Sequence, residues 1–393
     1  MAIINRIADA QADMTAWRHA IHSHPETAFE EVATADLVAR RLAEFGIEVH
    51  RGIAETGVVG VLQGAGGPNG KAIGLRADMD ALNVAEHNHF AHASKIAGKM
   101  HACGHDGHTA MLLGAAKYLA ETRNFAGTVN FIFQPAEEGR GGGKRMVAEG
   151  LFTRFPSDLV FGMHNWPDLP TGEFGVMAGP MMASADRFEI VVKGRGGHAA
   201  LPHHTVDPMV VAAQLVVAAQ TLVSRNLSPI EAGVVSITQI KAGTADNIIP
   251  EEVWLGGTLR ALSQEVRLRL EEGLRHLSQT LPSAFGAEAV FTFKPGYPPT
   301  VNDARAAEIA AQVAAEVVGA ERVHRHLGPS MGAEDFSYML LEKPGAYVWV
   351  GNGGGPGAGG NCMLHNPTYD FNDEILGVGA SFWARLVETV LAK

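Results

Sequence analysis

The chain has 393 residues, enough for two or three domains and a sizeable core. Hydrophobic residues make up 46% of it and charged residues 19%, a globular balance that excludes a largely disordered chain. The formal net charge is −11 and no run of Lys or Arg occurs, so we expect neither a nucleic acid nor an anionic membrane as partner.

The cysteines and the apolar runs indicate where such a protein works. Two cysteines cannot build a disulfide framework and fit the reducing cytosol. Residues 1–17 lack the charged and then apolar regions of a secretion signal. The longest apolar run, 209–223, is interrupted by Gln214 and Gln220 and predicts a buried helix rather than a membrane span. We therefore expect a cytoplasmic protein.

Helical and strand-like patterns alternate over the first 180 residues. Helical apolar spacing covers 28–45, where Gly46 stops the helix, and also 108–121. Short apolar runs predict strands at 57–62, 71–75, 128–133 and 159–162. This alternation predicts an α/β fold with an open, mostly parallel sheet.

The pattern changes near residue 184. The expected order is a strand at 186–193, a helix at 206–224, strands at 232–240 and 252–260, a helix at 264–280 and a strand at 288–294. This β-α-β-β-α-β order is ferredoxin-like. The α/β pattern then resumes with a helix at 303–318 and a strand at 347–351, followed by a glycine-rich loop over 351–360. We expect a discontinuous α/β domain (1–183 and 298–393) interrupted by a small α+β domain (184–297).

Four segments carry candidate metal ligands, and each follows a predicted strand or opens a predicted helix. They contain Cys103 and His105 (HACGHDGH), Glu137 and Glu138 (FQPAEEG), His164 (MHNW) and His365 (NCMLHNP). Open α/β sheets bind ligands beyond the carboxyl ends of their strands. Each segment alone has an ordinary explanation, such as a hydrogen-bonded loop histidine or a solvated turn. Their joint placement favours a metal site.

The donor set suits two divalent ions. Thiolate, imidazole and carboxylate together favour zinc, and manganese, cobalt and nickel also accept such ligands. One of the adjacent glutamates can bind metal while the other serves as a general base. Asp78 and Asp80 follow a strand and could orient a ligand imidazole, although a charged loop explains them equally well. We expect His101 and His108 to lie behind the ligands or at the helix start.

Together these motifs resemble one family along nearly the whole chain. The segments WRHAIHSHPE, GLRADMDAL, HACGHDGH, FQPAEEG, GMHNWP, GRGGHAALPH, GTLR, MGAEDF and LHNPTYDFND are similar to the aminoacylase and hippurate hydrolase group. That group includes plant auxin-conjugate amidohydrolases and belongs to a dinuclear-metal superfamily with glutamate carboxypeptidases. The resemblance implies a catalytic domain with an inserted lid or dimerisation domain.

The resemblance also implies roles for individual residues. The implied metal ligands are Cys103, as the bridging ligand, with His105, Glu138, His164 and His365. Glu137 is the implied general base, and Asp80 supports the ligands from behind. His198 is implied to reach the substrate carbonyl of the neighbouring subunit, while Asn247 and Arg260 resemble residues that hold the product's α-carboxylate.

Small departures from the family pattern are visible. Asp78 stands where the superfamily usually has a histidine, and Asn83 replaces the proline usual after DMDAL. The strip NHFAHASK (88–95) is less typical and is a candidate for shaping acyl-group specificity.

The expected function is metal-dependent hydrolysis of N-acyl amino acids, small-molecule substrates, by a homodimer or homotetramer. Three alternatives remain at this point. A metallo-dipeptidase or carboxypeptidase would use the same site. A thiol hydrolase would use Cys103 as nucleophile and His105 as base. A metal-binding protein without catalysis would need no general base beside Glu138.

Overall fold

The computed structural model describes residues 1–353 and 362–393, and residues 354–361 of the predicted glycine-rich loop lie outside the described part. Contacts within the chain define two compact units. Unit 1 comprises Met1–Gly179, Val301–Gly328 and Asp335–Lys393; unit 2 comprises Pro180–Thr300 and Pro329–Glu334. Within the described residues, no helix is both long and apolar enough to cross a membrane.

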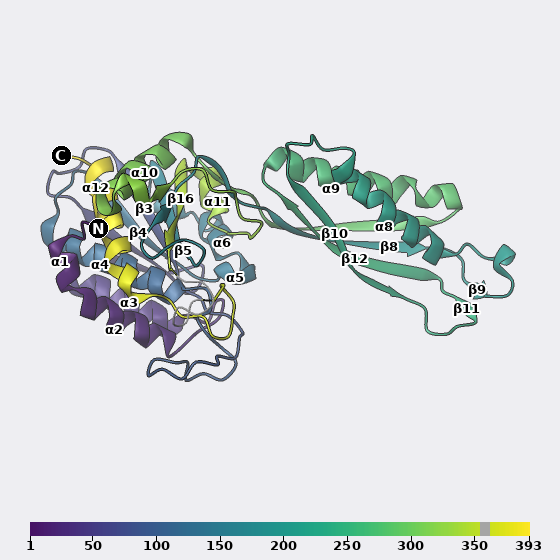
Figure 1. The fold of residues 1–393 in the computed structure, drawn as a ribbon, viewed down its shortest axis with the longest axis horizontal. Coiled ribbons are helices and arrows are strands. Elements are labelled where there is room, and N and C mark those ends of the chain that lie inside the picture. Colours follow the sequence, from purple (N-terminus) through teal and green to yellow (C-terminus); the bar gives the residue numbers. More distant parts are fainter. Residues whose placement is uncertain (354–361) are drawn as a thin grey trace. The chain divides into compact units, whose positions relative to one another are not determined.

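Unit 1 is built on an eight-stranded sheet in the order β1-β2-β4-β3-β5-β16-β6-β15 (Figure 1). The strands are β1 (Glu48–Ile53), β2 (Gly57–Gln63), β3 (Ala72–Asp78), β4 (Thr128–Gln134), β5 (Leu159–Trp166), β6 (Phe174–Gly175), β15 (Val323–His324) and β16 (Gly345–Gly351). The central four, β4-β3-β5-β16, are parallel, so their carboxyl ends share one edge. This confirms the predicted α/β class.

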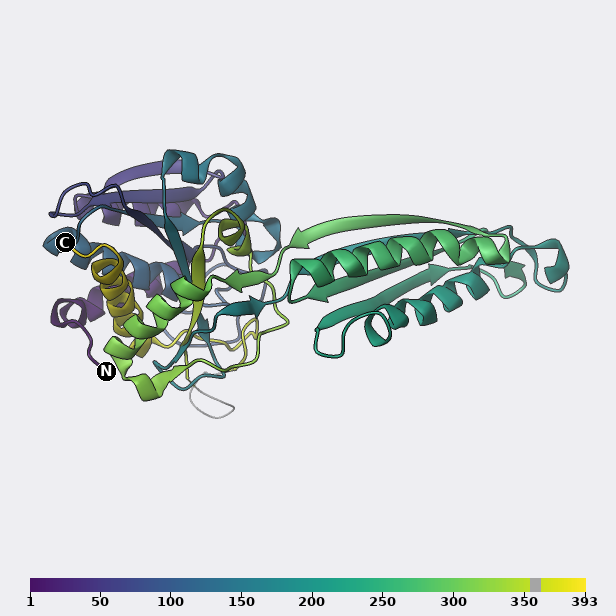
Figure 2. The ribbon, with the colours of Figure 1, turned by 90° about the horizontal axis from the view of Figure 1, so that it is seen from above.

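The helices of unit 1 bury apolar faces against this sheet and one another. They are α1 (Asn5–Asp9), α2 (Gln11–His22), α3 (Val32–Glu44), α4 (His105–Thr122), α5 (Glu137–Arg140), α6 (Gly142–Ala148), α7 (Leu151–Arg154), α10 (Ala304–Val318), α11 (Ser337–Glu342) and α12 (Leu376–Val390). Helix α4 packs against α2, α12 and β3, and the yellow α12 lies beside the green α10 (Figure 2). Met14, Leu113 and Trp383 are buried in this core.

Unit 2 contains a four-stranded antiparallel sheet in the order β10-β12-β8-β13. Its elements follow as β8 (Ala185–Lys193), α8 (Pro208–Ser224), β10 (Gly233–Ala242), β12 (Glu252–Ala261), α9 (Gln264–Thr280) and β13 (Glu288–Tyr297), the predicted β-α-β-β-α-β order. A core of its own, including Phe188, Leu215 and Leu270, joins the two helices to the sheet. Two small sheets pair β9 (Gly197–His198) with β11 (Ile248–Ile249) and β7 (Gly179–Met182) with β14 (Thr300–Asn302).

Some elements of unit 1 have no clear signal in the sequence. Strand β1 is largely exposed, so it lacks the alternation of a half-buried strand. Helix α12 is buried over most of its length and contains Gly377 and Gly379, and its exposed polar residues come only near its end, at Arg385 and Thr389. Helix α2 places Arg18 and His22 on its buried side, which breaks its apolar periodicity.

Candidate active site

A tight turn sets the spacing of Cys103 and His105. Gly104 between them has φ of +94°, and a Cβ there would lie 2.2 Å from Oδ1 of Asn165. A side chain is therefore excluded on both conformational and steric grounds. Helix α4 begins at His105, three residues before the predicted start at 108. Cys103 thus lies in the loop and His105 in the first turn, and both are buried.

Two carboxylates from other segments hold the turn that carries Glu137 and Glu138. Ala136 adopts φ of 56°, unusual for a residue with a Cβ, and its N–H donates to Oε1 of Glu31 at 2.9 Å. The carboxylate of Asp80 accepts the N–H groups of Glu137 at 3.0 Å and Glu138 at 2.9 Å. Asp80 therefore fixes the backbone of both glutamates.

His105 and His164 each donate a hydrogen bond from Nδ1–H to a backbone carbonyl. Their Nε2 atoms are therefore the unprotonated nitrogens that can bind a metal. Nδ1–H of His105 donates to the carbonyl of Asp80 at 2.8 Å, and Nδ1–H of His164 donates to that of Asn165 at 2.7 Å. Nε2 of His164 lies 3.3 Å from Sγ of Cys103. Such hydrogen bonds fix the tautomer that metal-ligating histidines use.

His365 joins the group from the segment after β16. Its backbone lies at φ of 67°, and its N–H donates to the carbonyl of Ala102 at 2.7 Å. Its Nε2 lies 3.2 Å from Oε1 of Glu138, and the side chain is 53% exposed. His365 therefore lies at the solvent side of the cluster.

The structure brings all of the predicted ligands and the predicted general base together. In each of several groups of three, the ligand atoms lie within 4.8 Å of one another. The groups are Cys103, His105 and His164; Cys103, Glu138 and His365; His105, Glu137 and Glu138; and Asp78, His105 and His108. Cys103 belongs to two of them, so one sulfur is within reach of two neighbouring positions.

The electrostatics of this cluster show a deficit of positive charge. Burial, then the charges of Glu138, Glu137 and Asp78, raise the pKa of Cys103 well above its usual value. Burial alone lowers the pKa of His105, but Asp78 and Asp80 outweigh it and raise that pKa to about 10. Nε2 of His105 is buried without a hydrogen-bond partner. A bound cation fits these residues, since it would balance the acids and occupy the unpartnered nitrogen.

Asp78 is fully buried and hydrogen-bonded on both carboxylate oxygens, unlike a charged loop residue. One of its oxygens lies 2.6 Å from Nδ1 of His108, and the other accepts from Arg76 at 2.7 Å. Burial opposes its ionisation, but His105, Arg76 and His108 together lower the pKa of Asp78 well below its usual value. Neither ring nitrogen of His101 has a hydrogen-bond partner among the described residues, and burial lowers its pKa to about 3. His101 is therefore neutral.

A polar network beneath the Glu137 turn has no signal of its own in the sequence. Arg76 donates to Gln134 at 2.9 Å and to Asp335 at 3.1 Å. Asp335 also accepts from Gln134 at 2.6 Å and from the N–H of Gly143 at 2.8 Å. The segments GLRADMDAL and MGAEDF contain Arg76 and Asp335, but only the fold shows that these two residues meet.

A second network that the sequence did not reveal adjoins the first turn of α4. Fully buried Arg18 donates to Asp106 at 2.7 Å and also pairs with Asp370. His22 contacts Asp106 at 2.8 Å and Glu86 at 3.1 Å. The segments WRHAIHSHPE, HACGHDGH and LHNPTYDFND contain Arg18, Asp106 and Asp370, but only the fold shows that these residues meet.

The remaining predicted residues all lie in unit 2. His198 and Asn247 are exposed, at or beside the β9–β11 pairing, and Nδ1 of His198 accepts the N–H of Ala200 at 3.1 Å. Arg260 lies apart on β12, half-buried, and donates to Oγ1 of Thr258 at 2.5 Å. The structure therefore does not unite these three residues in one site.

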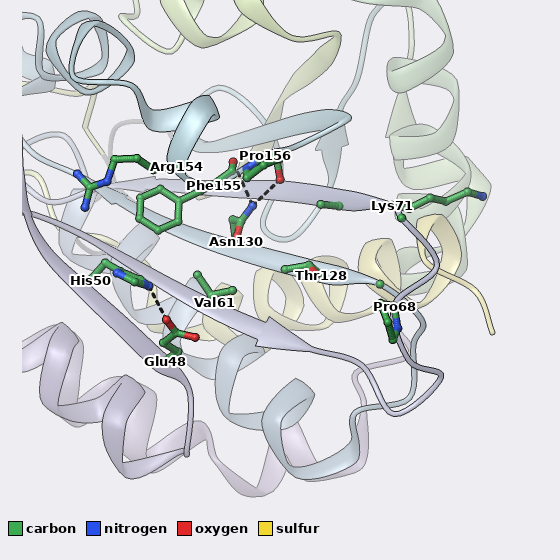
Figure 3. A pocket seen from close by; sticks show the side chains of 13 residues that line it. Glu48, His50, Val61, Pro68, Lys71, Thr128, Asn130, Arg154, Phe155 and Pro156 are labelled. Carbon is green, nitrogen blue, oxygen red and sulfur yellow. Dashed lines mark hydrogen bonds and ion pairs between the residues drawn. The ribbon is translucent and has the colours of Figure 1, made fainter.

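Two cavities of unit 1 differ in their relation to the cluster. One, of about 380 Å³, includes Glu138 in its wall. The other, of about 420 Å³, includes Ala72 and Thr128, the first residues of β3 and β4 (Figure 3). The second cavity therefore lies at the opposite edge of the sheet and contains none of the candidate ligands.

An α/β unit with a cluster of Cys, His and Glu at the carboxyl ends of parallel strands defines a metal-hydrolase type of site. Residues 74–389 match Peptidase family M20/M25/M40, and the chain belongs to this family. The resemblance to hippurate hydrolases and related amidohydrolases is thereby confirmed.

Individual relatives agree with this assignment. The chain is 44% identical to a hippurate hydrolase of Campylobacter jejuni over 98% of both chains. It is 40% identical to an N-acetylcysteine deacetylase of Bacillus subtilis over 95% of this chain and 96% of that protein. A solved Bacillus subtilis structure, described as a dinuclear metal binding peptidase of the M20 family, superposes with a TM-score of 0.85 at 36% identity, covering 98% of this chain and 99% of that one.

Proposed function

We propose that this protein is a metal-dependent amidohydrolase that cleaves N-acyl-L-amino acids to a carboxylic acid and a free amino acid. The observation that carries the proposal is the cluster of Cys103, His105, Glu138 and His164, in which burial and the neighbouring carboxylates raise the pKa of the Cys103 thiol. The relatives named hippurate hydrolase and N-acetylcysteine deacetylase support a linear amide as the substrate.

The ligands proposed for two divalent ions, zinc or manganese, with cobalt or nickel as substitutes, are Cys103, His105, Glu138, His164 and His365. Cys103 is the proposed bridging ligand, because it belongs to two groups of mutually close ligand atoms. When bound, such ions polarise a carbonyl and lower the pKa of a water molecule.

Glu137 is the proposed general base. Its carboxylate lies among the same groups, and Asp80 holds its backbone N–H at 3.0 Å. Glu137 would take the proton of the attacking water and return it to the leaving amine. Asp80 is a positioning residue, because it touches His105 and the backbone of both glutamates rather than the substrate.

The proposal also assigns roles to residues of unit 2 and to a second subunit. We propose that 184–297 is a lid and dimerisation domain, that His198 donates to the carbonyl oxygen of the substrate, and that Asn247 and Arg260 bind the α-carboxylate. The exposed apolar side chains of α8, including Val217 at 67% and Val210 at 51%, support a homodimeric contact.

The thiol mechanism is less well supported. A nucleophilic cysteine needs a lowered pKa, whereas burial and the neighbouring carboxylates raise the pKa of Cys103. Cys103 and Cys362 do not form a disulfide with each other, which fits the proposed location in the cytosol.

Hydrolysis assays with purified protein test the proposal. The substrates are hippurate, N-acetyl amino acids and dipeptides, assayed before chelation, after chelation and after metal is added back. We expect release of the free amino acid that chelation abolishes and zinc or manganese restores. Turnover unchanged by chelation would contradict the metal mechanism, and cleavage of dipeptides alone would assign a dipeptidase instead.

A further inference from the structure

The cavity beside Glu138 differs in character from a pocket for an apolar acyl group. Its volume of about 380 Å³ falls within the range of small-molecule sites. Charged and amide side chains, among them Glu30, Asn83, Lys99 and Arg140, dominate its lining. Such walls solvate polar groups well and give an aromatic ring little apolar surface to cover.

The two basic side chains of this cavity are not equivalent. Nζ of Lys99 donates to Oε2 of Glu30 at 2.6 Å, and Oγ1 of Thr27 donates to the same oxygen at 3.0 Å. The charge of Lys99 is therefore balanced by Glu30. The side chain of Arg140, in contrast, makes no hydrogen bond or ion pair with any residue of 1–353 or 362–393.

Arg140 is nevertheless close enough to influence the cavity electrostatically. The pKa of exposed Glu30 is lowered by Lys99 and Thr27 and, to a smaller extent, by the charge of Arg140. Its guanidinium is exposed, so water now solvates it and a ligand can reach it. An unpaired guanidinium is well suited to a carboxylate, which it can bind through two parallel hydrogen bonds.

The position of Glu138 connects this cavity to the reacting centre. Glu138 lines the cavity and is also a proposed metal ligand, so a substrate held at the centre can extend one end toward Arg140. This step rests on the proposed function.

We propose that the cavity receives a second carboxylate of the substrate and that Arg140 determines this specificity. The substrate class is then an N-acyl amino acid that carries a carboxylate besides the α-carboxylate. That group is either the far end of a dicarboxylic acyl chain or the side chain of an acidic amino acid. Asn83 contributes an exposed amide that can donate to the same group.

Two matched substrate pairs distinguish these sources in the metal-loaded enzyme. The first pair is N-succinyl-L-alanine and its terminal amide, and the second is N-acetyl-L-glutamate and N-acetyl-L-glutamine. For the pair whose charged end enters the cavity, we expect a kcat/KM about tenfold higher for the carboxylate member. In Arg140→Gln this ratio falls to about one, and Arg140→Lys keeps part of it. The pair whose ratio falls in Arg140→Gln shows whether the carboxylate belongs to the acyl chain or to the amino acid side chain.

Arg145→Gln is the matched control, because Arg145 is an exposed arginine of α6 that pairs with Glu55 and Glu149 outside the cavity. It should leave both ratios unchanged. Ratios near one in the wild type for both pairs, or a ratio that Arg140→Gln does not change, would overturn the inference. N-acetyl-L-alanine reports the proposed function separately: its metal-dependent turnover upholds that function whatever the ratios are, and loss of turnover on every substrate overturns the function itself.

Discussion

Two buried clusters of charged side chains meet at the first turn of α4, one through His105 and the other through Asp106. Around His105, burial and then the negative charges of Glu138, Glu137 and Asp78 raise the pKa of the Cys103 thiol. Around Asp106, by contrast, Arg18 pairs with three carboxylates and His22 contacts two. Adjacent residues of one helix thus belong to two different clusters: in the first, carboxylates lie against a buried thiol, and in the second, they pair with a buried guanidinium.

This difference separates a site that binds from a site that holds the structure. In the second cluster each carboxylate already lies against Arg18 or His22, so a further ion is not needed to hold these acids. A cluster with excess acid and an unpartnered His105 Nε2 is stabilised by a cation. We therefore expect substitutions in the first cluster to affect turnover and substitutions in the second to affect stability.

The largest expected effect is in the first cluster. Glu137→Gln should reduce kcat about a thousandfold, because the amide cannot accept a proton from water. Metal content measured by elemental analysis should stay at the wild-type level. Glu48→Gln, an exposed glutamate of β1 far from the cluster, is the control. Wild-type turnover in Glu137→Gln would remove Glu137 from the mechanism.

In the second cluster, Arg18→Met should lower the free energy of unfolding by about 3–5 kcal/mol, because Asp106 would stay buried without its partner. Denaturant unfolding of the metal-free protein measures this loss. Arg145→Met, at an exposed ion pair, should cost less than about 0.5 kcal/mol. Similar small losses in both variants would show that the Arg18 cluster does not stabilise the fold.

A smaller effect should depend on pH. Burial alone lowers the pKa of His22, but Asp106 and Glu86 outweigh it and raise that pKa from 6.5 to about 9. The stabilisation by protonated His22 is therefore complete below about pH 6.5 and is lost as the pH rises through about 9, a change of about 3 kcal/mol.

Thermal unfolding of metal-free wild type and His22→Gln at pH 6 and pH 9.5 checks this. The wild type should be more stable than the variant at pH 6, and the difference should shrink at pH 9.5. A difference that is constant with pH would mean that His22 does not titrate in this range.

Much of the fold and the candidate site could be predicted from the sequence, because both depend on local patterns. Strands β2, β3 and β4 are short apolar runs, and Gly46 marks the end of α3. Glu137, Glu138 and His365 follow parallel strands, so their meeting at one edge of the sheet was expected from topology alone. His164 was also found, although it lies inside β5, which continues four residues beyond its predicted end.

Other features could not be read from local patterns because they join segments distant in sequence. Arg18 and Asp370 are 352 positions apart, and Arg76 and Asp335 are 259 apart. A buried charge resembles an exposed one in a sequence, since both are simply polar positions until a partner is known. Helix α12 was missed as well, because most of its positions are buried and its exposed polar residues come only near its end.

The sequence by itself determined the α/β class, the donor residues and the family, because hydrophobic periodicity and closely spaced motifs are local properties of the chain. Only the tertiary structure decided which charges are balanced. It pairs Lys99 with Glu30 and leaves Arg140 without a partner among the described residues, and it surrounds Cys103 with acids while it surrounds Asp106 with cations. The physical reason is that the pKa and the reactivity of a side chain depend on burial and on neighbours within a few ångströms, which only the folded chain brings together.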